Sequence, residues 1–507
     1  MSHNKNSANK SEKIIILGSV FLCGGVLMVL EIIGGRIFAP FFGTSIYIWT
    51  SLIGIVLASM SIGYFIGGKL ADKGATFERY SLIILIGAAA VAFVAFAKVP
   101  ILSAISQIPV SLPARGLLGA FILFALPAAV LAMSSPFAVK LMLRTVDNAG
   151  AVSGRVSAYY TVGSIIGTFS AGFVLIPLFN NTRIITGLAL ILAIVAVAVY
   201  PQKRKILKSA RTINVFVTTV ALLIFAQIPL GMPENIVAAR DTRYNAVLVY
   251  DTIYNDQPTR IMQLGTQWQS GKNLNNNEEF VFEYMASFNL AFHFAENIDR
   301  ALTIGGAGYS YPQYFVRNHL HAHMDVVEID AAVTGLAKAH FNLAETMDFA
   351  GSRLQIFHED GRIFLNNNNR KYDAIFNDAF NASSPPFQLL TLETKQHIYN
   401  ALEDGGVFIS NIHAAFEGTN SRILSAYYNT VREVFPQVFL LAPQQRPHNE
   451  IQNVIIVALK SDEPQAMTSD SPEMQYLLNQ RFTDEVPQIN LILTDNHAPV
   501  EFLTRHR

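Results

Sequence analysis

Three acidic residues in the second half of the chain directly follow short apolar runs that predict β-strands: Glu328, Asp360 and Asp378. The glycine-rich stretch TIGGAGYSY at 303–311 follows another such run. Glycines let a backbone approach a nucleotide closely, and a helix that begins behind them offers free N–H groups. A carboxylate one strand later can accept hydrogen bonds from both ribose hydroxyls. These residue types, in this order, predict a nucleotide site at the ends of strands.

The spacing narrows the class of nucleotide. Glu328 lies 22 residues after Gly306, at the end of the next predicted strand, where it suits a ribose. In EDG at 359–361, Asp360 and Gly361 suit an adenine, with the carboxylate accepting from the exocyclic amine. The loop lacks the full GxGxxG spacing of dinucleotide sites. Successive acids therefore favour the adenosine of S-adenosylmethionine over NAD. The loop glycines are Gly305, Gly306 and Gly308.

The elements that position these residues alternate between strand-like and helix-like patterns over 276–507. Such alternation predicts a doubly wound, mostly parallel sheet, whose ligands lie at the carboxyl ends of the strands. We therefore expect a Rossmann-like α/β domain of the class I methyltransferase type. Short β-like runs separated by turn residues predict a small β-subdomain over 235–275. The helical periodicity of 280–295 predicts a helix between them.

The first half of the chain differs sharply in composition. Charged residues make up 15% of the whole chain and mean hydropathy is +0.32, because long apolar runs fill 14–231. About 20 apolar residues span a bilayer as a helix, so this half predicts a multi-span membrane domain behind a disordered terminus at 1–13. The predicted spans are 14–38, 47–68, 80–97, 116–142, 156–178, 184–200 and 212–231.

Lys and Arg residues gather in the loops on the side of the N-terminus, which predicts a cytoplasmic N-terminus in a multi-pass inner-membrane protein. Seven spans would then place the second half outside, whereas S-adenosylmethionine is a cytoplasmic molecule, so the side stays open. Glu31 lies near the end of the first span, before Arg36. A structural contact with Arg36 or the backbone, and a transport or substrate role, are both compatible with that position.

Other features restrict the partners. A net charge of zero gives no argument for nucleic acid, and a single cysteine, Cys23, excludes a disulfide framework or a cysteine-based metal site. The three histidines of HLHAH at 319–323 could share a face and bind metal, but a solvated loop is the favoured interpretation. We therefore predict no metal, and as partners a lipid bilayer, a small-molecule amine and a second copy of the chain.

Residues 235–507 resemble the spermidine synthase family of aminopropyltransferases, and the whole pattern resembles its membrane-fused relatives. The resemblance is carried by LTIGGAG, VVEID, HEDGR, YDAIFNDAF, LEDGGVFISNIH and LTDNHAPVE, and upstream by the stretch from MVLEIIGGR to GGKLAD. It implies decarboxylated S-adenosylmethionine or S-adenosylmethionine as co-substrate and an amine or polyamine as acceptor. In this family the Asp at the position of Asp378 helps to deprotonate the attacking amine.

The resemblance also implies further site residues, and several depart from the family pattern. Gly308 stands where synthases have an Asp that contacts the aminopropyl amine, and Asn381 stands where they have a second, diamine-holding Asp. A glutamine that helps to bind the co-substrate corresponds loosely to Gln269. The sequence therefore favours binding of an adenosyl sulfonium over putrescine. The remaining candidate substrate residues are Glu283, Tyr284, Tyr309 and His413.

Three functions remain open at this point. The leading hypothesis is a membrane-anchored transferase that alkylates an amine, with Asp378 as base or amine anchor. The second is a methyltransferase or other sulfonium-cleaving enzyme on the same fold. The third is a transporter or sensor whose soluble domain binds a nucleotide without chemistry. Tyr309 and Tyr311 could face the sulfonium charge or simply pack.

Overall fold

The structure is a computed structural model in which the chain divides into two compact units. The helical unit is Met1–Met232 and the α/β unit is Pro233–Arg507. The structure describes residues 10–43, 45–143, 145, 148–200, 210–226, 235–242, 244–265, 267–276, 280–295, 297–379, 385–486 and 489–504.

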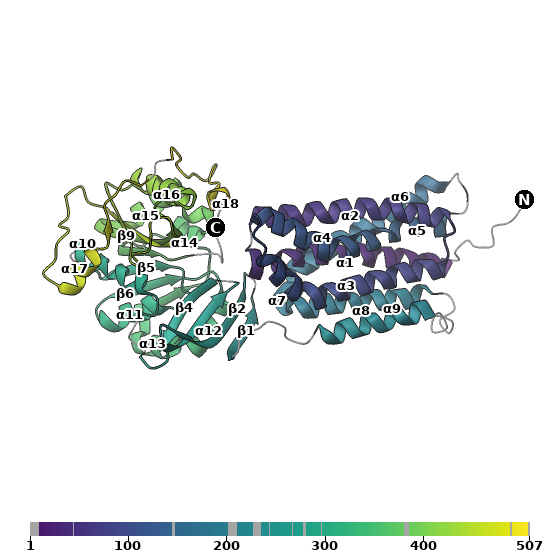
Figure 1. Cartoon of the computed structure of the whole chain (residues 1–507), viewed down its shortest axis with the longest axis horizontal. Helices are drawn as coiled ribbons and strands as arrows, with labels where there is room; N and C mark the ends of the chain where they lie inside the picture. Colours follow the sequence, from purple (N-terminus) through teal and green to yellow (C-terminus); the bar gives the residue numbers. More distant parts are fainter. Residues whose placement is uncertain are drawn as a thin grey trace, which may run out of the picture. The chain divides into compact units, whose positions relative to one another are not determined.

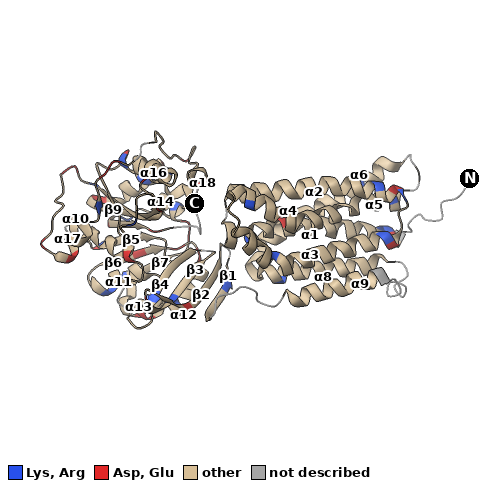
Figure 2. Cartoon of the chain, in the orientation of Figure 1, with Lys and Arg blue, Asp and Glu red and all other residues tan. Residues whose placement is uncertain are grey.

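The helical unit is a bundle of long helices that lie side by side (Figure 1). Charged residues are sparse along these helices and gather near their ends (Figure 2). Large apolar side chains are exposed on the outside of these helices as well as buried between them, whereas a surface helix of a soluble domain is apolar on one face only. The elements are α1 (Lys10–Phe42), α2 (Ile46–Asp72), α3 (Phe77–Ser106), α4 (Leu112–Ala132), α5 (Ser134–Met142), α6 (Ala149–Ser170), the π-helical η2 (Ala171–Leu175), α7 (Ile176–Leu178), α8 (Asn181–Val199) and α9 (Ala210–Phe225).

Six of the predicted spans correspond to helices that are long and apolar enough to cross a membrane. The seventh, predicted over 212–231, is described only as far as α9 extends, and the apolar part of that helix is Thr212–Phe225. Its predicted residues 227–231 lie outside the described ranges. The disordered terminus predicted for 1–13 is wrong for 10–13, because α1 already begins at Lys10, and 1–9 are not described.

Glycines set the closest helix contacts of this unit. A Cβ atom on Gly163 or Gly167 of α6 would collide with the backbone of Phe21 or Gly25 of α1. The two helices therefore touch backbone to backbone, as small residues permit. The pairing also fixes their relative direction: higher numbers on α1 meet higher numbers on α6, so α1 and α6 run parallel.

The α/β unit begins with a four-stranded antiparallel sheet in the order β1-β2-β3-β4. The positive φ angles of Asn255 and Asp256 form the tight turn between β2 and β3. This sheet corresponds to the β-subdomain expected over 235–275. Its strands are β1 (Ile236–Asp241), β2 (Ala246–Tyr254), β3 (Gln257–Leu264) and β4 (Gln267–Asn273).

An eight-stranded sheet forms the centre of the α/β unit, in the order β12-β10-β11-β9-β8-β5-β6-β7. The five strands from β9 to β7 are parallel, and the last three along the chain are antiparallel. The strands are β5 (Arg300–Ile304), β6 (His323–Val327), β7 (Leu354–Phe357), β8 (Tyr372–Asn377), β9 (Leu402–Ala414), β10 (Gln437–Leu441), β11 (Gln452–Leu459) and β12 (Arg481–Phe482).

Helices connect the strands and lie against the sheet (Figure 1). Alternate residues of β5 enter different cores: Ala301 joins one apolar cluster, and Leu302 and Ile304 join the other. The helix predicted over 280–295 is a 3-10 helix followed by one short α-helical turn. The elements are η4 (Glu283–Leu290), α10 (Ala291–Phe294), α11 (Ser310–Asn318), α12 (Ala331–His340), α13 (Leu343–Ala350), α14 (Gly361–Asn367), α15 (Leu392–Ala401), α16 (Arg422–Arg432), α17 (Pro472–Leu478) and α18 (Val500–Leu503).

The strand order reverses between β5 and β8. From β5 the chain moves outward through β6 to β7, and it then returns to pair β8 with the other side of β5. Ligands of doubly wound sheets lie at such a switch point, beyond the carboxyl ends of the strands. Because β5, β6, β7 and β8 are parallel neighbours, the three predicted acids lie at this one edge.

Candidate active site

The glycine loop begins exactly where β5 meets the segment after β8. Gly305 has a φ of +97°, a conformation that side chains disfavour. A Cβ atom there would lie 2.5 Å from the carbonyl oxygen of Asp378. The amide of Asp378 in turn donates to the carbonyl of Ile304 at 2.9 Å. Only glycine fits between the loop and Asp378, so the two are held side by side.

Glu328 holds the glycine loop from the neighbouring strand. Its Oε2 accepts from the amides of Gly306 at 2.9 Å and Ala307 at 3.0 Å, and its Oε1 accepts from the amide of Asp330 at 2.9 Å. Burial raises the pKa of this carboxyl, while the three N–H donors oppose that shift. The residue predicted to bind ribose is therefore also the anchor of the loop.

Gly308 is closed off by the small β-sheet. Its amide donates to Oγ of Ser270 on β4 at 2.8 Å. A Cβ atom on residue 308 would lie 2.6 Å from the Cβ of Ser270. Gln269, the predicted co-substrate residue, is the partly buried neighbour of Ser270 on the same strand. An acidic side chain at 308 has no room unless Ser270 moves.

Two tyrosines of the loop pack into the core. Tyr309 is fully buried, and its hydroxyl shares a 2.7 Å hydrogen bond with Oγ1 of Thr334 on α12. Tyr311 is also buried and lies edge-on to Phe376 of β8 with ring centroids 4.9 Å apart. Of the two alternatives for these rings, the structure favours packing over a position facing the sulfonium.

Asp378 stands at the end of β8 with a hydrogen-bond donor on each oxygen. The hydroxyl of Tyr284 donates to Oδ2 at 2.9 Å, and the amide nitrogen Nδ2 of Asn411 donates to Oδ1 at 2.9 Å. Burial raises the pKa of the Asp378 carboxyl, and the two donors counteract this shift. Tyr284 comes from η4 and Asn411 from β9, so three separate elements position one carboxylate.

The other predicted substrate residues differ in how they lie relative to the Asp378 carboxylate. Glu283 is exposed, whereas its neighbour Tyr284 is buried against Asp378. His413 follows Asn411 by two positions on β9, so both side chains leave the same face of the sheet. Asn381 lies outside the described residues.

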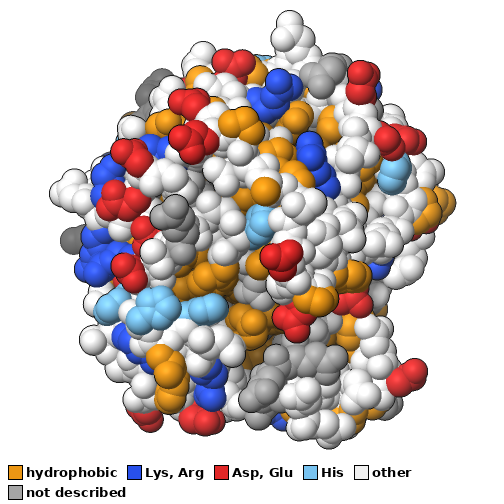
Figure 3. Space-filling view, turned by 90° about the vertical axis from the view of Figure 1, so that its left-hand side faces the viewer, with side chains coloured by type: hydrophobic (Ala, Val, Ile, Leu, Met, Phe, Trp, Pro, Cys, Tyr) orange, Lys and Arg blue, Asp and Glu red, His pale blue; other side chains and the backbone are white. Residues whose placement is uncertain are grey.

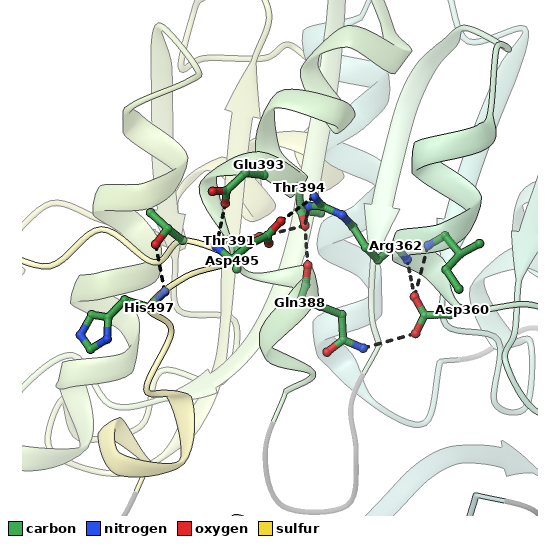
Figure 4. Close-up of polar contacts among 10 residues, drawn as sticks. Asp360, Arg362, Gln388, Thr391, Glu393, Thr394, Asp495 and His497 are labelled. Carbon is green, nitrogen blue, oxygen red and sulfur yellow. Dashed lines mark hydrogen bonds and ion pairs between the residues drawn. The ribbon is translucent and has the colours of Figure 1, made fainter.

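Asp360 caps the helix that follows β7. Its Oδ1 accepts from the amides of Arg362 at 2.8 Å and Ile363 at 3.3 Å (Figure 4). Its Oδ2 accepts from Nε2 of Gln388 at 3.3 Å. A Cβ atom on Gly361 would lie 2.6 Å from the side chain of Ile304 on β5. Asp360 thus links the predicted adenine position to the segment that follows Asp378.

The C-terminal motif LTDNHAPVE closes over this segment. Asp495 accepts from the guanidinium of Arg362 at 2.9 Å and from the hydroxyl of Thr391 at 2.7 Å (Figure 4). Its amide donates to the carboxylate of Glu393 at 2.9 Å. Arg362 also contacts Thr394. The tail therefore fastens α14 and α15 together beside Gln388.

A buried lysine lies behind the same segment. Lys395 is fully buried on α15, and its Nζ donates to the carbonyl of Leu389 and to the hydroxyl of Tyr427, each at 2.9 Å. Tyr427 donates on to Ser410 of β9 at 3.0 Å. Burial lowers the pKa of Lys395 well below its ordinary value. This hydrogen-bond network from Lys395 through Tyr427 ends at Ser410, the residue before Asn411.

The sequence interpretation missed Asn411, Ser270 and the role of Tyr284 as a donor to Asp378. Asn411 has a signal in the sequence, because it lies near the end of a buried strand, β9, which is the neighbour of β8. Ser270 has none, since its partner Gly308 is 38 positions away and belongs to another subdomain.

The three histidines of HLHAH differ in their surroundings, and His321 is exposed. The ring of His319 stacks on Phe292 with centroids 3.9 Å apart, and His323 is the first residue of β6. Among the described residues, no three His, Cys, Asp or Glu side chains gather as metal ligands would. Acidic, basic and hydrophobic side chains intermingle on the face of the molecule seen in Figure 3.

Comparison with known families matches residues 278–465 to the spermine/spermidine synthase domain. This part of the chain is a spermine/spermidine synthase domain. It includes all three strand-end acids and both donors to Asp378. Ser270 and Asp495 lie outside the matched range, on either side of the synthase domain.

Curated relatives are polyamine aminopropyltransferases. A probable polyamine aminopropyl transferase of Bifidobacterium longum is 26% identical over 232 residues, covering 42% of this chain and 50% of the relative. The polyamine aminopropyltransferase of Moorella thermoacetica is 29% identical over 160 residues, covering 31% and 54%. The chain thus spans about half the length of the curated relatives that it matches.

Similar solved structures include a probable spermidine synthase from Corynebacterium glutamicum, with a TM-score of 0.41 and 19% identity, covering 49% of this chain and 87% of that one. Spermidine synthase from Thermotoga maritima gives a TM-score of 0.38 and 18% identity, covering 54% and 84%.

Proposed function

We propose that the chain is a membrane-anchored transferase of aminopropyltransferase type, which alkylates an amine from an adenosyl sulfonium donor. The observation that carries this proposal is Asp378, a carboxylate fixed by Tyr284 and Asn411 directly against the glycine loop. The synthase domain and the names of its curated relatives support the same reaction class.

The chemistry needs little from the protein beyond position and a base. The amine nitrogen attacks the carbon next to the sulfonium sulfur, a C–N bond forms, and the C–S bond breaks. The electron pair of that bond returns to sulfur, which leaves as a neutral thioether. Asp378 accepts the proton that the nitrogen loses. Holding the two reactants in line and removing this proton both accelerate the reaction.

The donor would lie along the strand ends. Glu328 suits the ribose and Asp360 the adenine, because both carboxylates stand at the edge where Asp378 ends its strand. Glu328 already accepts three hydrogen bonds, and a carboxylate offers about four acceptor directions. A ribose diol needs two, so we expect Gly306 or Ala307 to release Glu328 when the donor binds.

At position 308 the chain has glycine where spermidine synthases have an aspartate. That aspartate contacts the amine at the end of the donor's aminopropyl chain. The structure fills the space next to this residue with Ser270 and Phe341. An acid that would contact an aminopropyl amine from this position is therefore absent. Decarboxylated and full-length S-adenosylmethionine are therefore both candidate donors.

We further propose that the α/β unit works on the cytoplasmic side. Six long apolar helices that each cross the membrane would return the chain to the side where it begins, and the sequence places the excess of Lys and Arg on that side. The 14 residues Thr212–Phe225 of α9 extend only ~21 Å, against a bilayer core of ~30 Å. Phe225 packs against Phe96, ten residues before the end of α3. Thus the described part of α9 stops short.

Cysteine labelling tests the side. The native Cys23 is buried and gives a low background. Tyr476→Cys places a thiol on the exposed surface of the α/β unit, and Lys73→Cys places one on the N-terminal side of the bundle. Both should react with an impermeant maleimide only after the membrane is opened. Reaction of residue 476 in intact cells would place the α/β unit outside.

The reaction class is tested by incubating the purified chain with each sulfonium donor and a panel of primary amines, followed by mass analysis. Methylthioadenosine together with an amine enlarged by a three-carbon chain supports the proposal. Adenosylhomocysteine with a methylated product would show a methyltransferase instead. Binding of a donor without any product would favour a sensor or transporter.

A further inference from the structure

Within the part of the helical unit that the structure describes, one carboxyl group has no hydrogen-bond or ion-pair partner. Glu31 lies in the second half of α1 and is 9% exposed. It makes no hydrogen bond or ion pair with any residue in the described ranges, Arg36 included. Carboxylates inside apolar helices are costly and generally face a partner, a cavity or a bound charge. The structural contact that the sequence left open for Glu31 is therefore not found.

The position of Glu31 on α1 can be read from two neighbouring glycines. Gly24, Glu31 and Gly35 are spaced by 7 and then 4 residues, so they lie on one face of the helix. A Cβ atom on Gly24 would collide with the carbonyl of Tyr160 on α6, and one on Gly35 would lie 2.5 Å from Trp49 on α2. The face that carries Glu31 is thus turned towards α2 and α6.

Neither neighbouring helix offers a cation at this level. The basic residue of α6 is Arg155, twelve positions before Gly167, which meets Gly25. At 1.5 Å per residue, Arg155 lies ~27 Å along the axis from the level of Glu31. The basic residue of α2 is Lys69, near the end opposite to Trp49. These two helices therefore supply no cation at the level of Glu31.

The register brings Glu31 level with a break in α6. Gly167 meets Gly25, so the residues level with Glu31 fall in the π-helical Ala171–Leu175. In this turn the amide of Ile176 donates to the carbonyl of Ala171. The next residue is Pro177, which has no N–H to continue the pattern onto Gly172. Such π-turns occur often at functional sites, and freed carbonyls are ligands for cations.

We propose that Glu31 is the counter-charge for one monovalent, hydrogen-bonding cation bound inside the helical unit, either a proton or a protonated primary amine. One carboxylate without a second charge matches a single positive charge. A divalent metal ion would require more oxygen ligands. The site is independent of the transferase chemistry, which uses the α/β unit.

An apolar carbodiimide tests the site, because it modifies protonated carboxyl groups that are shielded from water. The full-length chain in liposomes is treated with dicyclohexylcarbodiimide, and the adduct is located by peptide mass spectrometry. We expect an adduct on Glu31 at acid pH that falls about tenfold for each pH unit once the carboxyl is ionised. Glu31→Gln should abolish this adduct, whereas Asp72→Asn should keep it, since Asp72 is exposed and paired with Lys140 at 2.8 Å.

Two further arms identify the cation. If putrescine slows the labelling at constant pH, or couples to residue 31 as an amide of distinct mass, the cation is an ammonium. If only pH changes the labelling, the cation is a proton. An unmodified Glu31 at acid pH in a folded chain overturns the proposal, and so does protection by sodium ions alone. A circular-dichroism spectrum and a thermal unfolding curve of Glu31→Gln that match those of the parent chain show that the helical unit of the variant is folded.

Discussion

Asp378 in the synthase domain and Glu31 in the helical unit are both carboxyls withdrawn from water, but their surroundings differ. Asp378 has a fixed donor on each oxygen, and Glu328 beside it has three backbone N–H groups. Glu31 has none of these among the described residues. The first arrangement keeps a carboxylate charged and aimed before any ligand arrives. The second leaves the charge to be neutralised by whatever binds.

The largest expected effect is a loss of turnover on removal of the base, Asp378, while donor binding is kept. Asp378→Asn keeps the size of the side chain but removes the proton acceptor. Turnover should fall by about 10²–10⁴-fold, the range for loss of a positioned base. Donor affinity, measured by calorimetry, should stay within a few fold. Asp404→Asn serves as control, because Asp404 is fully exposed in the same unit. Full activity in Asp378→Asn would remove Asp378 from the mechanism.

The next effect concerns the anchor of the glycine loop. Glu328→Gln removes the negative charge that accepts from Gly306 and Ala307 and that would accept from ribose. Charge-assisted hydrogen bonds contribute about 1.5–3 kcal/mol each, so donor affinity should fall by ~10–100-fold. Calorimetry against Glu345→Gln, an exposed glutamate, measures the difference. Unchanged affinity would mean that Glu328 serves the loop alone.

The two donors to Asp378 should govern the pH dependence. Burial raises the pKa of Asp378, and Tyr284 and Asn411 lower it again by stabilising the carboxylate. Removing either donor, by Tyr284→Phe or Asn411→Leu, should raise this pKa further. The acid limb of kcat/KM should therefore move to higher pH in both variants, by about one unit for each 1.4 kcal/mol lost.

The exposed Tyr476 provides the control for that shift. Tyr476→Phe should keep the pH profile of the parent chain. An acid limb that stays in place in Tyr284→Phe and Asn411→Leu, with only kcat lowered, would mean that these residues shape the pocket without acting on the charge of Asp378.

The smallest effect is on stability. Burial lowers the pKa of Lys395 in the folded chain, whereas an unfolded lysine titrates near 10.4. The unfolded chain binds the extra proton between these values, so stability should rise with pH across that window, by at most about 1.4 kcal/mol per pH unit. Thermal unfolding of the full chain between pH 7 and 9 should show this slope, and Lys395→Met should flatten it. A slope that survives in the variant would assign it to other groups.

Much of this architecture could be predicted because it depends on local patterns. The three acids follow apolar strands, and parallel neighbours bring strand ends together, so the sequence alone predicts that Glu328, Asp360 and Asp378 lie at one edge. Pairings across large separations could not be predicted. Tyr284 reaches Asp378 over 94 positions and Ser270 reaches Gly308 over 38, and neither leaves a periodic signal.

The ends and irregular turns of the helices also could not be predicted from the sequence patterns. Apolar composition locates the spans, but the start of α1 at Lys10 and the π-turn in the predicted span 156–178 depend on packing against neighbouring helices. The glycines of α6 that meet α1 determine that packing, and it is their register that places the π-turn level with Glu31.

The central claim is that Asp378 serves the transfer of a carbon chain from an adenosyl sulfonium to an amine. Donors labelled with isotope in the three-carbon chain, or in the methyl group, test it directly when incubated with amines and either the parent chain or Asp378→Asn. We predict that chain label enters the amine with the parent protein and that transfer is lost in the variant, which still binds the donor. Methyl label in the product, or equal transfer by both proteins, would contradict the account.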